Sequence, residues 1–221
     1  MKFKQRFSDV DLQKIKAAVK VAEDKISGEI VPVIVERSGN YTTAHYKAGM
    51  IAAALAYAVM IILDRYVIED ANHTLYYDPV FIFVVVTLAG IAGALLLSAS
   101  SALKRLFVSN EHLDLSTRQR AEMSFLEEEV FNTRQRTGIM IFISFFEHKV
   151  IVMADKGISK LVEQREWDNI VHSLVVHIRN GEIVQGLEAS IQRCGEILLE
   201  RGFNKTEGDI NELGDDLRIN R

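Results

Sequence analysis

AGMIAAALAYAVMIIL, residues 48–63, and PVFIFVVVTLAGIAGALLLSASSAL, residues 79–103, contain no charged residue. About 20 apolar residues are enough to cross a bilayer as a helix. The second stretch reaches that length alone, and Ala44, Tyr46 and Lys47 extend the first toward the lipid headgroups. Burial of two such helices on every side is difficult in a soluble protein of 221 residues. The sequence therefore predicts a transmembrane helical hairpin over residues 44–103 that contacts the lipid bilayer.

The charges around the hairpin predict its orientation. The connecting loop, residues 64–78, is acidic and carries Asp64, Glu69, Asp70 and Asp78. The flanks of the hairpin are basic and carry Arg37, Lys47, Lys104 and Arg105. Lys and Arg near membrane-spanning segments are retained on the cytoplasmic side. We therefore expect a multi-pass protein of the bacterial inner membrane, with both termini in the cytoplasm and only the loop outside.

Small residues recur at a spacing of four in both apolar stretches, as Gly49 and Ala53 and as Gly90 and Ala94. Such pairs let two helices approach closely. They predict either packing within the hairpin or a homo-oligomer formed through it, and the sequence does not choose between these two interpretations.

The residues before the hairpin predict one helix and one strand. Ser8 and Asp11 have the spacing of a capping box, and a helix is expected over residues 8–26. Residues 29–35 (EIVPVIV) have the pattern of a buried strand. Pro32 cannot donate to a ladder, so this strand is expected at an edge or with a bulge.

The residues after the hairpin predict the remainder of the same domain. Ser116 and Gln119 resemble a second capping box, which opens a helix to about residue 133 with Met123, Leu126 and Val130 facing inward. Two strands, residues 138–146 and 149–154, and two amphipathic helices follow. Residues 204–221 are polar and are expected to form a flexible tail.

Together these segments predict an α/β domain, a three-layer α/β/α sandwich with a small mixed sheet, interrupted in sequence by the transmembrane hairpin. Its two parts are residues 1–43 and 104–203, and the hairpin occupies residues 44–103.

Composition excludes several classes of function. The net charge of −4 and the lack of a basic run argue against a nucleic-acid partner. Cys194 is the only cysteine, which rules out a disulfide within the chain and a thiolate metal cluster. The sequence contains no glycine-rich phosphate loop, GxSxG elbow or HExxH motif. Catalysis is therefore left open, and no catalytic residue is assigned.

Two acidic residues at strand ends are candidate metal ligands. Glu29 opens the first strand and Asp155 follows the third. Carboxylates beside glycine-containing turns could bind a hard cation such as Ca²⁺ or Mg²⁺. Helix capping or surface salt bridging is the alternative role for each.

Three apolar segments resemble the TPM-domain family. They are residues 27–31 (SGEIV), residues 138–144 (GIMIFIS), and residues 149–152 (KVIV) leading into Gly157 and Ile158. The resemblance covers residues 8–36 and about 116–203. It implies an α/β/α sandwich, and it brings the family's activities as expectations. Plant relatives act in photosystem II repair and as acid phosphatases in the thylakoid lumen, an animal relative is an auxiliary subunit of an acetylcholine receptor, and some bacterial members bind calcium.

This chain departs from the family in its turn after the third strand. Residues 154–158 read ADKGI, where many relatives have a Gly-Tyr-Gly-Leu type turn. The expected function is a cytoplasmic-side interaction module that contacts a membrane-protein partner in assembly, repair or quality control. The alternative is a Ca²⁺- or Mg²⁺-dependent, acid-phosphatase-like hydrolase that uses Glu29 and Asp155.

Overall fold

The computed structural model describes residues 7–66, 78–206, 208 and 210–220. Most of the predicted acidic loop, including Glu69 and Asp70, lies outside these residues. The chain divides into two compact units. The first unit combines residues 1–39 and 114–221, and the second comprises residues 40–113.

A mixed sheet of four strands forms the centre of the first unit, in the order β3-β2-β1-β4. β1 is parallel to β2 and β4, and β3 is antiparallel to β2. The strands are β1 (Glu29–Val35), β2 (Gly138–Ser144), β3 (Lys149–Ala154) and β4 (Arg218–Asn220). The helices are α1 (Asp9–Glu23), α5 (Asn110–Glu127), α6 (Lys156–Ser159), α7 (Gln164–Arg179) and α8 (Ile183–Glu200), and α5 begins in the second unit.

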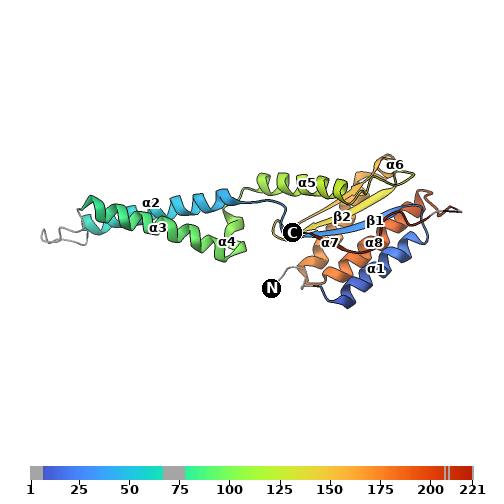
Figure 1. Ribbon diagram of the computed structural model, residues 1–221, viewed down its shortest axis with the longest axis horizontal. Coiled ribbons are helices and arrows are strands. Elements are labelled where there is room, and N and C mark those ends of the chain that lie inside the picture. Colours follow the sequence, from blue (N-terminus) through green and yellow to red (C-terminus); the bar gives the residue numbers. More distant parts are fainter. Residues whose placement is uncertain (1–6, 67–77, 207, 209, 221) are drawn as a thin grey trace. The chain divides into compact units, whose positions relative to one another are not determined.

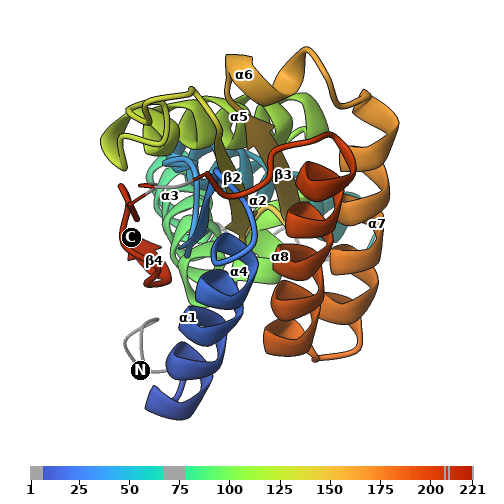
Figure 2. The same ribbon diagram turned by 90° about the vertical axis from the view of Figure 1, so that its right-hand side faces the viewer.

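Alternation along the strands gives the sheet two apolar faces. Ile30 and Ile34 of β1 join the larger core cluster, which also contains the buried residues of α1, α7 and α8. Val31, Val33 and Val35 belong to a second cluster with residues of α5. Figure 2 shows the strands between α5 and the layer formed by α1, α8 and α7. The predicted three-layer α/β/α sandwich with a small mixed sheet is confirmed.

The capping box at the start of α1 is present as predicted. Asp11 N–H donates to Ser8 Oγ over 3.2 Å, and Ser8 N–H donates to Asp11 Oδ2 over 3.0 Å. The helix ends at Glu23, before the predicted end at residue 26. Ile26 instead forms an antiparallel bridge with Asn204, and Ser27 N–H donates to the Phe203 carbonyl.

Pro32 lies in an interior strand, but at a position where its missing N–H has no ladder to join. Glu29 N–H donates to the Thr137 carbonyl, so the N–H groups of Glu29, Val31 and Val33 point toward β2. Pro32 therefore faces the opposite side, and pairing with β4 begins only at Val33. The prediction that this strand lies at an edge is wrong, because β1 lies between β2 and β4. At Pro32 itself, however, the side toward β4 has no strand partner.

The prediction of a flexible tail over residues 204–221 is wrong for the described residues. Residues 218–220 form β4 and pair with residues 33–35 of β1. Lys16 Nζ also lies 2.9 Å from Asp216 Oδ1. Backbone hydrogen bonds and ion pairs hold this segment. Neither requires a periodic pattern of apolar residues, so no sign of the strand is present in the sequence.

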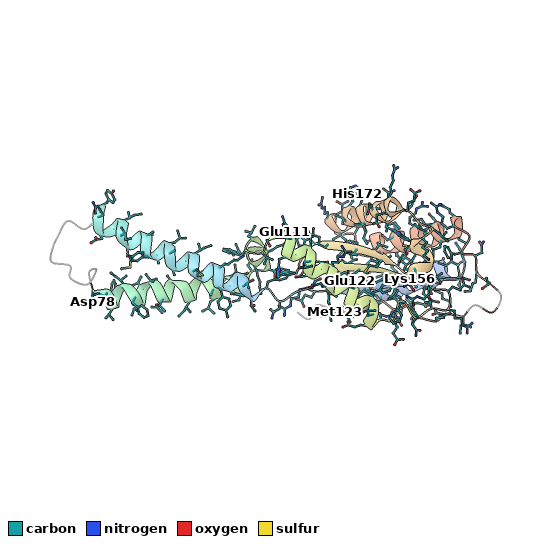
Figure 3. The ribbon with its side chains drawn as sticks, turned by 90° about the horizontal axis from the view of Figure 1, so that it is seen from above. Asp78, Glu111, Glu122, Met123, Lys156 and His172 are labelled. Atoms are coloured by element: carbon teal, nitrogen blue, oxygen red, sulfur yellow. The ribbon has the colours of Figure 1, made fainter. Side chains whose placement is uncertain are left out.

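α5 begins at Asn110, so the predicted capping box at Ser116 is wrong. The predicted inward face is wrong for Met123, which is 53% exposed, and for Leu126, which is 61% exposed. Val130, just after the helix, is buried as predicted. Thr117, Ala121 and Ser124 are buried instead. Figure 3 labels Met123 on α5. Small and hydroxyl side chains therefore form part of the inner face of α5.

The second unit is a helical hairpin with a short third helix, formed by α2 (Thr42–Tyr66), α3 (Pro79–Ala99) and α4 (Ser101–Leu106). α2 and α3 lie side by side along their length (Figure 1). Both are long and apolar enough to cross a membrane, and only 6% of the most apolar stretch of each is buried. The core helix of a soluble protein would be mostly buried, so the low figure favours membrane association.

Glycines form the contact between α2 and α3. A Cβ atom added to Gly49 would lie 3.0 Å from the Gly90 carbonyl oxygen, and one added to Gly93 would lie 2.4 Å from Ala52 Cβ. A Cβ atom on Gly90 would lie 3.4 Å from Ala53 Cβ. The small residues singled out in the sequence therefore pack within the hairpin.

Candidate functional site

The two predicted metal ligands lie at the same edge of the sheet. Glu29 opens β1 opposite Gly138, the first residue of β2. Asp155 follows β3, and its N–H donates to the Gly138 carbonyl over 2.9 Å. The two acids therefore flank the start of β2, at the amino ends of the parallel pair. Doubly wound sheets place ligands at the carboxyl ends of their strands, so that general rule does not apply at this edge.

Glu29 attaches the C-terminal segment to the sheet. Its carboxylate accepts hydrogen bonds from Glu212 N–H over 3.0 Å and from Leu213 N–H over 3.3 Å. The residue is only 7% exposed. Backbone donors of this kind stabilise an ionised carboxylate in a buried position.

Asp155 forms a two-pronged ion pair with Arg136. Arg136 Nε lies 2.6 Å from Oδ2, and Nη2 lies 3.0 Å from Oδ1. Lys156 N–H also donates to Oδ1 over 2.7 Å, so Asp155 is the N-cap of α6. The hydrogen bonds that Arg136 donates to Asp155 raise the pKa of Arg136. Capping and salt bridging, the alternative role named for this residue, are both present.

The geometry offers limited support for a cation at these acids. Both oxygens of Asp155 already accept hydrogen bonds from donors of the protein. Across the described part of the chain, His, Cys, Asp and Glu side chains form no group of three or more that could hold a metal ion. Ca²⁺ takes six to eight oxygen ligands. Binding of Ca²⁺ or Mg²⁺ by Glu29 and Asp155 stays a prediction.

Glu23 is a further acid near this edge that the sequence reasoning missed. Its Oε1 accepts a hydrogen bond from Ile30 N–H over 2.8 Å, while its buried Oε2 has no hydrogen-bond partner among the described residues. Burial raises the pKa of Glu23 to about 8, and the nearby Glu29 and Asp215 add to the increase. Glu23 is therefore mostly protonated at neutral pH. The signal was its position four residues after Val19, on the apolar face of α1.

Two small cavities share Gly28 and Glu29 among their lining residues. One has a volume of about 110 Å³ and is lined by polar side chains that include Thr133, Arg134 and Thr206. The other has a volume of about 270 Å³, and Glu23, Lys205 and Asp215 are among its lining residues.

Comparison with known families identifies this domain. The family model of the TPM domain matches residues 103–197, from α4 to α8. Residues 103–197 match a TPM domain. The match begins after β1, although β1 pairs with β2 along its whole length and belongs to the same sheet. We call residues 1–39 and 114–221 the TPM unit and residues 40–113 the hairpin unit.

A solved structure has the same fold. It is the NMR structure of the BA42 protein from the psychrophilic bacterium Bizionia argentinensis, with a TM-score of 0.57 and 16% sequence identity. The similarity covers 97% of this chain and 95% of that chain. At this identity the likeness shows the fold alone. A comparison with curated proteins found no match.

Proposed function

We propose that this chain is a membrane-anchored TPM-domain protein of the bacterial inner membrane. In this proposal the TPM unit works on the cytoplasmic side as an interaction module for a membrane-protein partner, in assembly, repair or quality control. The observation that carries the proposal is the outward exposure of the large apolar side chains of α2 and α3.

That exposure covers both helices of the hairpin. On α2, Met50 is 74% exposed and Leu55 is 61% exposed, and on α3, Phe83 is 70% exposed and Leu96 is 67% exposed. Each fully buried side chain of this size gains roughly 1.5–3 kcal/mol on leaving water. A surface of this kind is stable in lipid and would aggregate in water. The hairpin therefore suits a bilayer.

An interaction role fits the TPM unit better than catalysis does. The acids at the sheet edge hold parts of the protein together, since Glu29 binds two backbone N–H groups and Asp155 binds Arg136. Cys194 is buried, and burial raises the pKa of its thiol to about 12, so it is not a nucleophile at neutral pH. Recognition of a partner requires only a well-formed surface, which this unit provides.

Membrane topology tests the anchoring half of the proposal. In a Cys194→Ser background, Asp78→Cys should react in whole spheroplasts with a maleimide that does not cross membranes. Asp24→Cys should react only after the membrane is permeabilised. Recovery of the protein in the supernatant after carbonate extraction would contradict the proposal, and reversed labelling would contradict the orientation.

Partner capture tests the interaction half. Full-length protein with a photo-crosslinker at Lys156, beside the sheet edge, should capture the same membrane protein in repeated mild-detergent purifications. A matched crosslinker at Asp168, on the surface of α7, is the control. Equal or absent capture from both positions would contradict an interaction site at the sheet edge.

The second candidate function is a Ca²⁺- or Mg²⁺-dependent phosphatase, because Glu29 and Asp155 share one edge of the sheet and Glu29 lines both cavities. A cation there would polarise a phosphoryl oxygen. Full-length protein that hydrolyses an aryl phosphate with either ion, and loses this activity in Asp155→Asn but not in the surface variant Asp168→Asn, would favour it. Thermal melting of both variants separates lost chemistry from lost folding.

A further inference from the structure

The short helix α4 exposes its apolar side chains and partly covers its charged ones. Leu106 is 80% exposed, the highest value among the large apolar side chains that the structure describes, and Leu103 is 48% exposed. Lys104 and Arg105 are only partly exposed. In water the opposite arrangement is normal.

The two kinds of side chain lie on different sides of α4. With about 100° of rotation per residue, Leu103 and Leu106 lie roughly 60° apart around the helix axis. Lys104 and Arg105 lie on the remaining arc. This separation is the pattern of a helix that lies in the plane of a membrane interface.

The orientation of α4 is fixed by the chain on both sides of it. Ser100 has an extended backbone, with φ −135° and ψ 115°, so α3 ends there and a new helix begins. After α4, Phe107 and Val108 pack against Ala44, Ala48 and Leu97 at the base of the hairpin. Leu103 and Leu106 are therefore held outward by the residues that follow them.

The base of the hairpin carries residue types that are common at the level of the lipid headgroups. Tyr46, which lies between the buried Ala44 and Ala48 on α2, is 73% exposed, and the exposed Lys47 is next to it. Tyrosine and lysine are enriched at the level of the headgroups. The apolar surface of the hairpin thus continues into α4, at the level expected for the phosphates of the lipid headgroups.

We propose that α4 is an interfacial helix that binds anionic lipid. Leu103 and Leu106 enter the boundary between acyl chains and headgroups, and Lys104 and Arg105 contact headgroup phosphates. The occupant is lipid because the apolar face is continuous with the bilayer-facing surface and its two cations complement anionic headgroups. This inference rests on the proposed membrane anchoring and adds a preference for anionic lipid and a fixed depth for the hairpin.

Quenching of tryptophan fluorescence by brominated lipids tests the position of α4. The full chain is reconstituted in vesicles with Leu106→Trp, and the native Trp167, buried in the TPM unit, gives a constant background. Leu106→Trp should be quenched most strongly by bromines near the glycerol end of the acyl chains. Leu88→Trp, in the middle of α3, should be quenched most by deep bromines, and Val21→Trp, on α1, by neither.

The outcomes separate the inference from the function on which it rests. Quenching of Leu88→Trp together with no quenching of Leu106→Trp would overturn the role of α4 and leave membrane anchoring intact. No quenching of Leu88→Trp would overturn the anchoring itself.

The charges are tested in the same vesicles, made with phosphatidylcholine alone or with added phosphatidylglycerol. The anionic lipid should increase the quenching of Leu106→Trp, and high salt should remove that increase. Adding Lys104→Gln and Arg105→Gln should abolish the difference between the two lipid mixtures. An unchanged difference in this variant would overturn the assignment of the two cations to anionic headgroups.

Discussion

The TPM unit and the hairpin unit place small and large side chains in opposite ways. In the TPM unit the branched residues of β1 and β2 are buried, and Ile30, Ile34 and Ile141 are each no more than 1% exposed. In the hairpin unit glycine and alanine face the partner helix, while leucine and phenylalanine face outward. The first unit thus buries its large apolar side chains and the second exposes them, which is the arrangement expected of helices in lipid.

The two units also differ in what their close contacts achieve. A Cβ atom added to Gly138 would lie 2.0 Å from the Val130 carbonyl oxygen, where backbone meets backbone within the TPM unit. A Cβ atom added to Gly93 would meet a side-chain atom of the neighbouring helix. The steric clash of a larger residue at Gly138 cannot be relieved by a side-chain movement. The clash of a larger residue at Gly93 can be relieved when the two helices separate.

The largest expected effect follows from Gly138→Ala. Val130 cannot move without displacing the start of β2, so the variant should lose roughly 4 kcal/mol or more of unfolding free energy. Denaturant melts followed by Trp167 fluorescence, in mild detergent, measure this loss. Gly214→Ala is the control, because the nearest atom to its added Cβ is a flexible Arg218 nitrogen at 3.7 Å. Equal stability of the two variants would contradict the close packing at Gly138.

Gly93→Leu should have the next largest effect and should leave the TPM unit folded. Overpacking against Ala52 should cost about 1–3 kcal/mol of the contact between α2 and α3. Disulfide crosslinking between cysteines placed on the two helices measures that contact, and Ala58→Leu, at an exposed position, is the control. If the hairpin also forms a homo-oligomer through its small residues, Gly93→Leu should dissociate the oligomer in detergent. If these residues pack only within the hairpin, the oligomeric state should be unchanged.

Glu23→Gln should change the pH dependence of the stability of the TPM unit. The pKa of Glu23 rises from 4.5 to about 8 on folding, so the folded state keeps a proton that the unfolded state releases between these values. The free energy of unfolding therefore falls as the pH rises from about 4.5 to about 8.

Glutamine keeps the acceptor for Ile30 N–H and does not titrate. The variant should be more stable than the unmodified protein at pH 8 by roughly 1–3 kcal/mol, and similar to it at pH 4. Asp24→Asn, one residue away and exposed, is the control. Parallel stability curves for Glu23→Gln and the unmodified protein would contradict the burial of a protonated acid.

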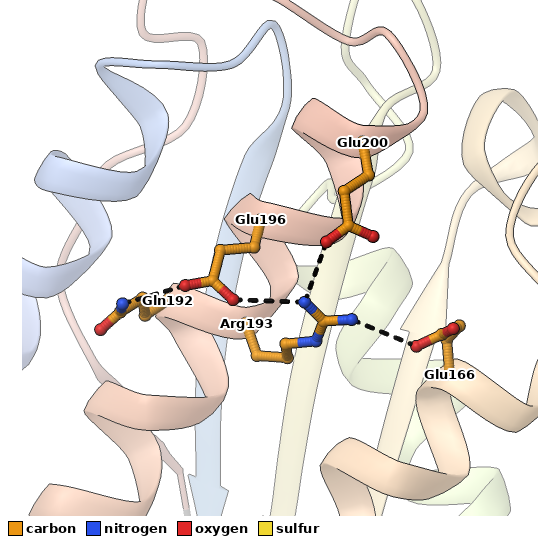
Figure 4. Close-up of polar contacts among 5 residues, drawn as sticks. All are labelled: Glu166, Gln192, Arg193, Glu196 and Glu200. Atoms are coloured by element: carbon orange, nitrogen blue, oxygen red, sulfur yellow. Dashed lines mark hydrogen bonds and ion pairs between the residues drawn. The ribbon is translucent and has the colours of Figure 1, made fainter.

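Arg193→Gln should have the smallest effect. Arg193 lies among three carboxylates on α7 and α8, with distances of 3.5 Å to Glu166, 3.2 Å to Glu196 and 3.1 Å to Glu200 (Figure 4). These side chains are 32–58% exposed, so solvent screens the ion pairs and the loss should be about 1 kcal/mol or less. Thermal melts at low and high salt measure it, and a loss that did not shrink in high salt would contradict an exposed network.

The elements with a strong local signal were predictable from the sequence. The bounds of β1 and β3 and the capping box of Ser8 and Asp11 match the predictions, because each depends on residues close together in the chain. The hairpin helices were predictable for the same reason. Both Glu29 and Asp155 were predicted from the sequence as acids at strand ends. The ion pair between Asp155 and Arg136 could not be predicted, because it depends on the folded structure.

The remaining features depend on contacts between distant residues. β4 is held by backbone bonds to β1 and by ion pairs such as that between Arg218 and Glu128 at 3.1 Å, neither of which requires an apolar pattern. The inner face of α5 is made of Thr117, Ala121 and Ser124, which a search for large apolar residues does not find. Glu23 was missed because a carboxyl group was not expected on the apolar face of α1, where its spacing from Val19 places it and where Ile30 N–H donates to it.

The base of the hairpin unit has a consequence for how the sheet forms. Tyr41 and His112 meet edge to face, with ring centroids 5.6 Å apart, and Tyr41 and Leu113 are each 1% exposed. The two points at which the chain enters and leaves the hairpin unit are therefore held together. If the hairpin forms first, the loop that β1 and β2 must close is shorter by about a factor of three, which removes roughly 1 kcal/mol of loop-closure entropy from the folding barrier. In that case the hairpin assists folding, since it brings together two parallel strands that are distant in sequence.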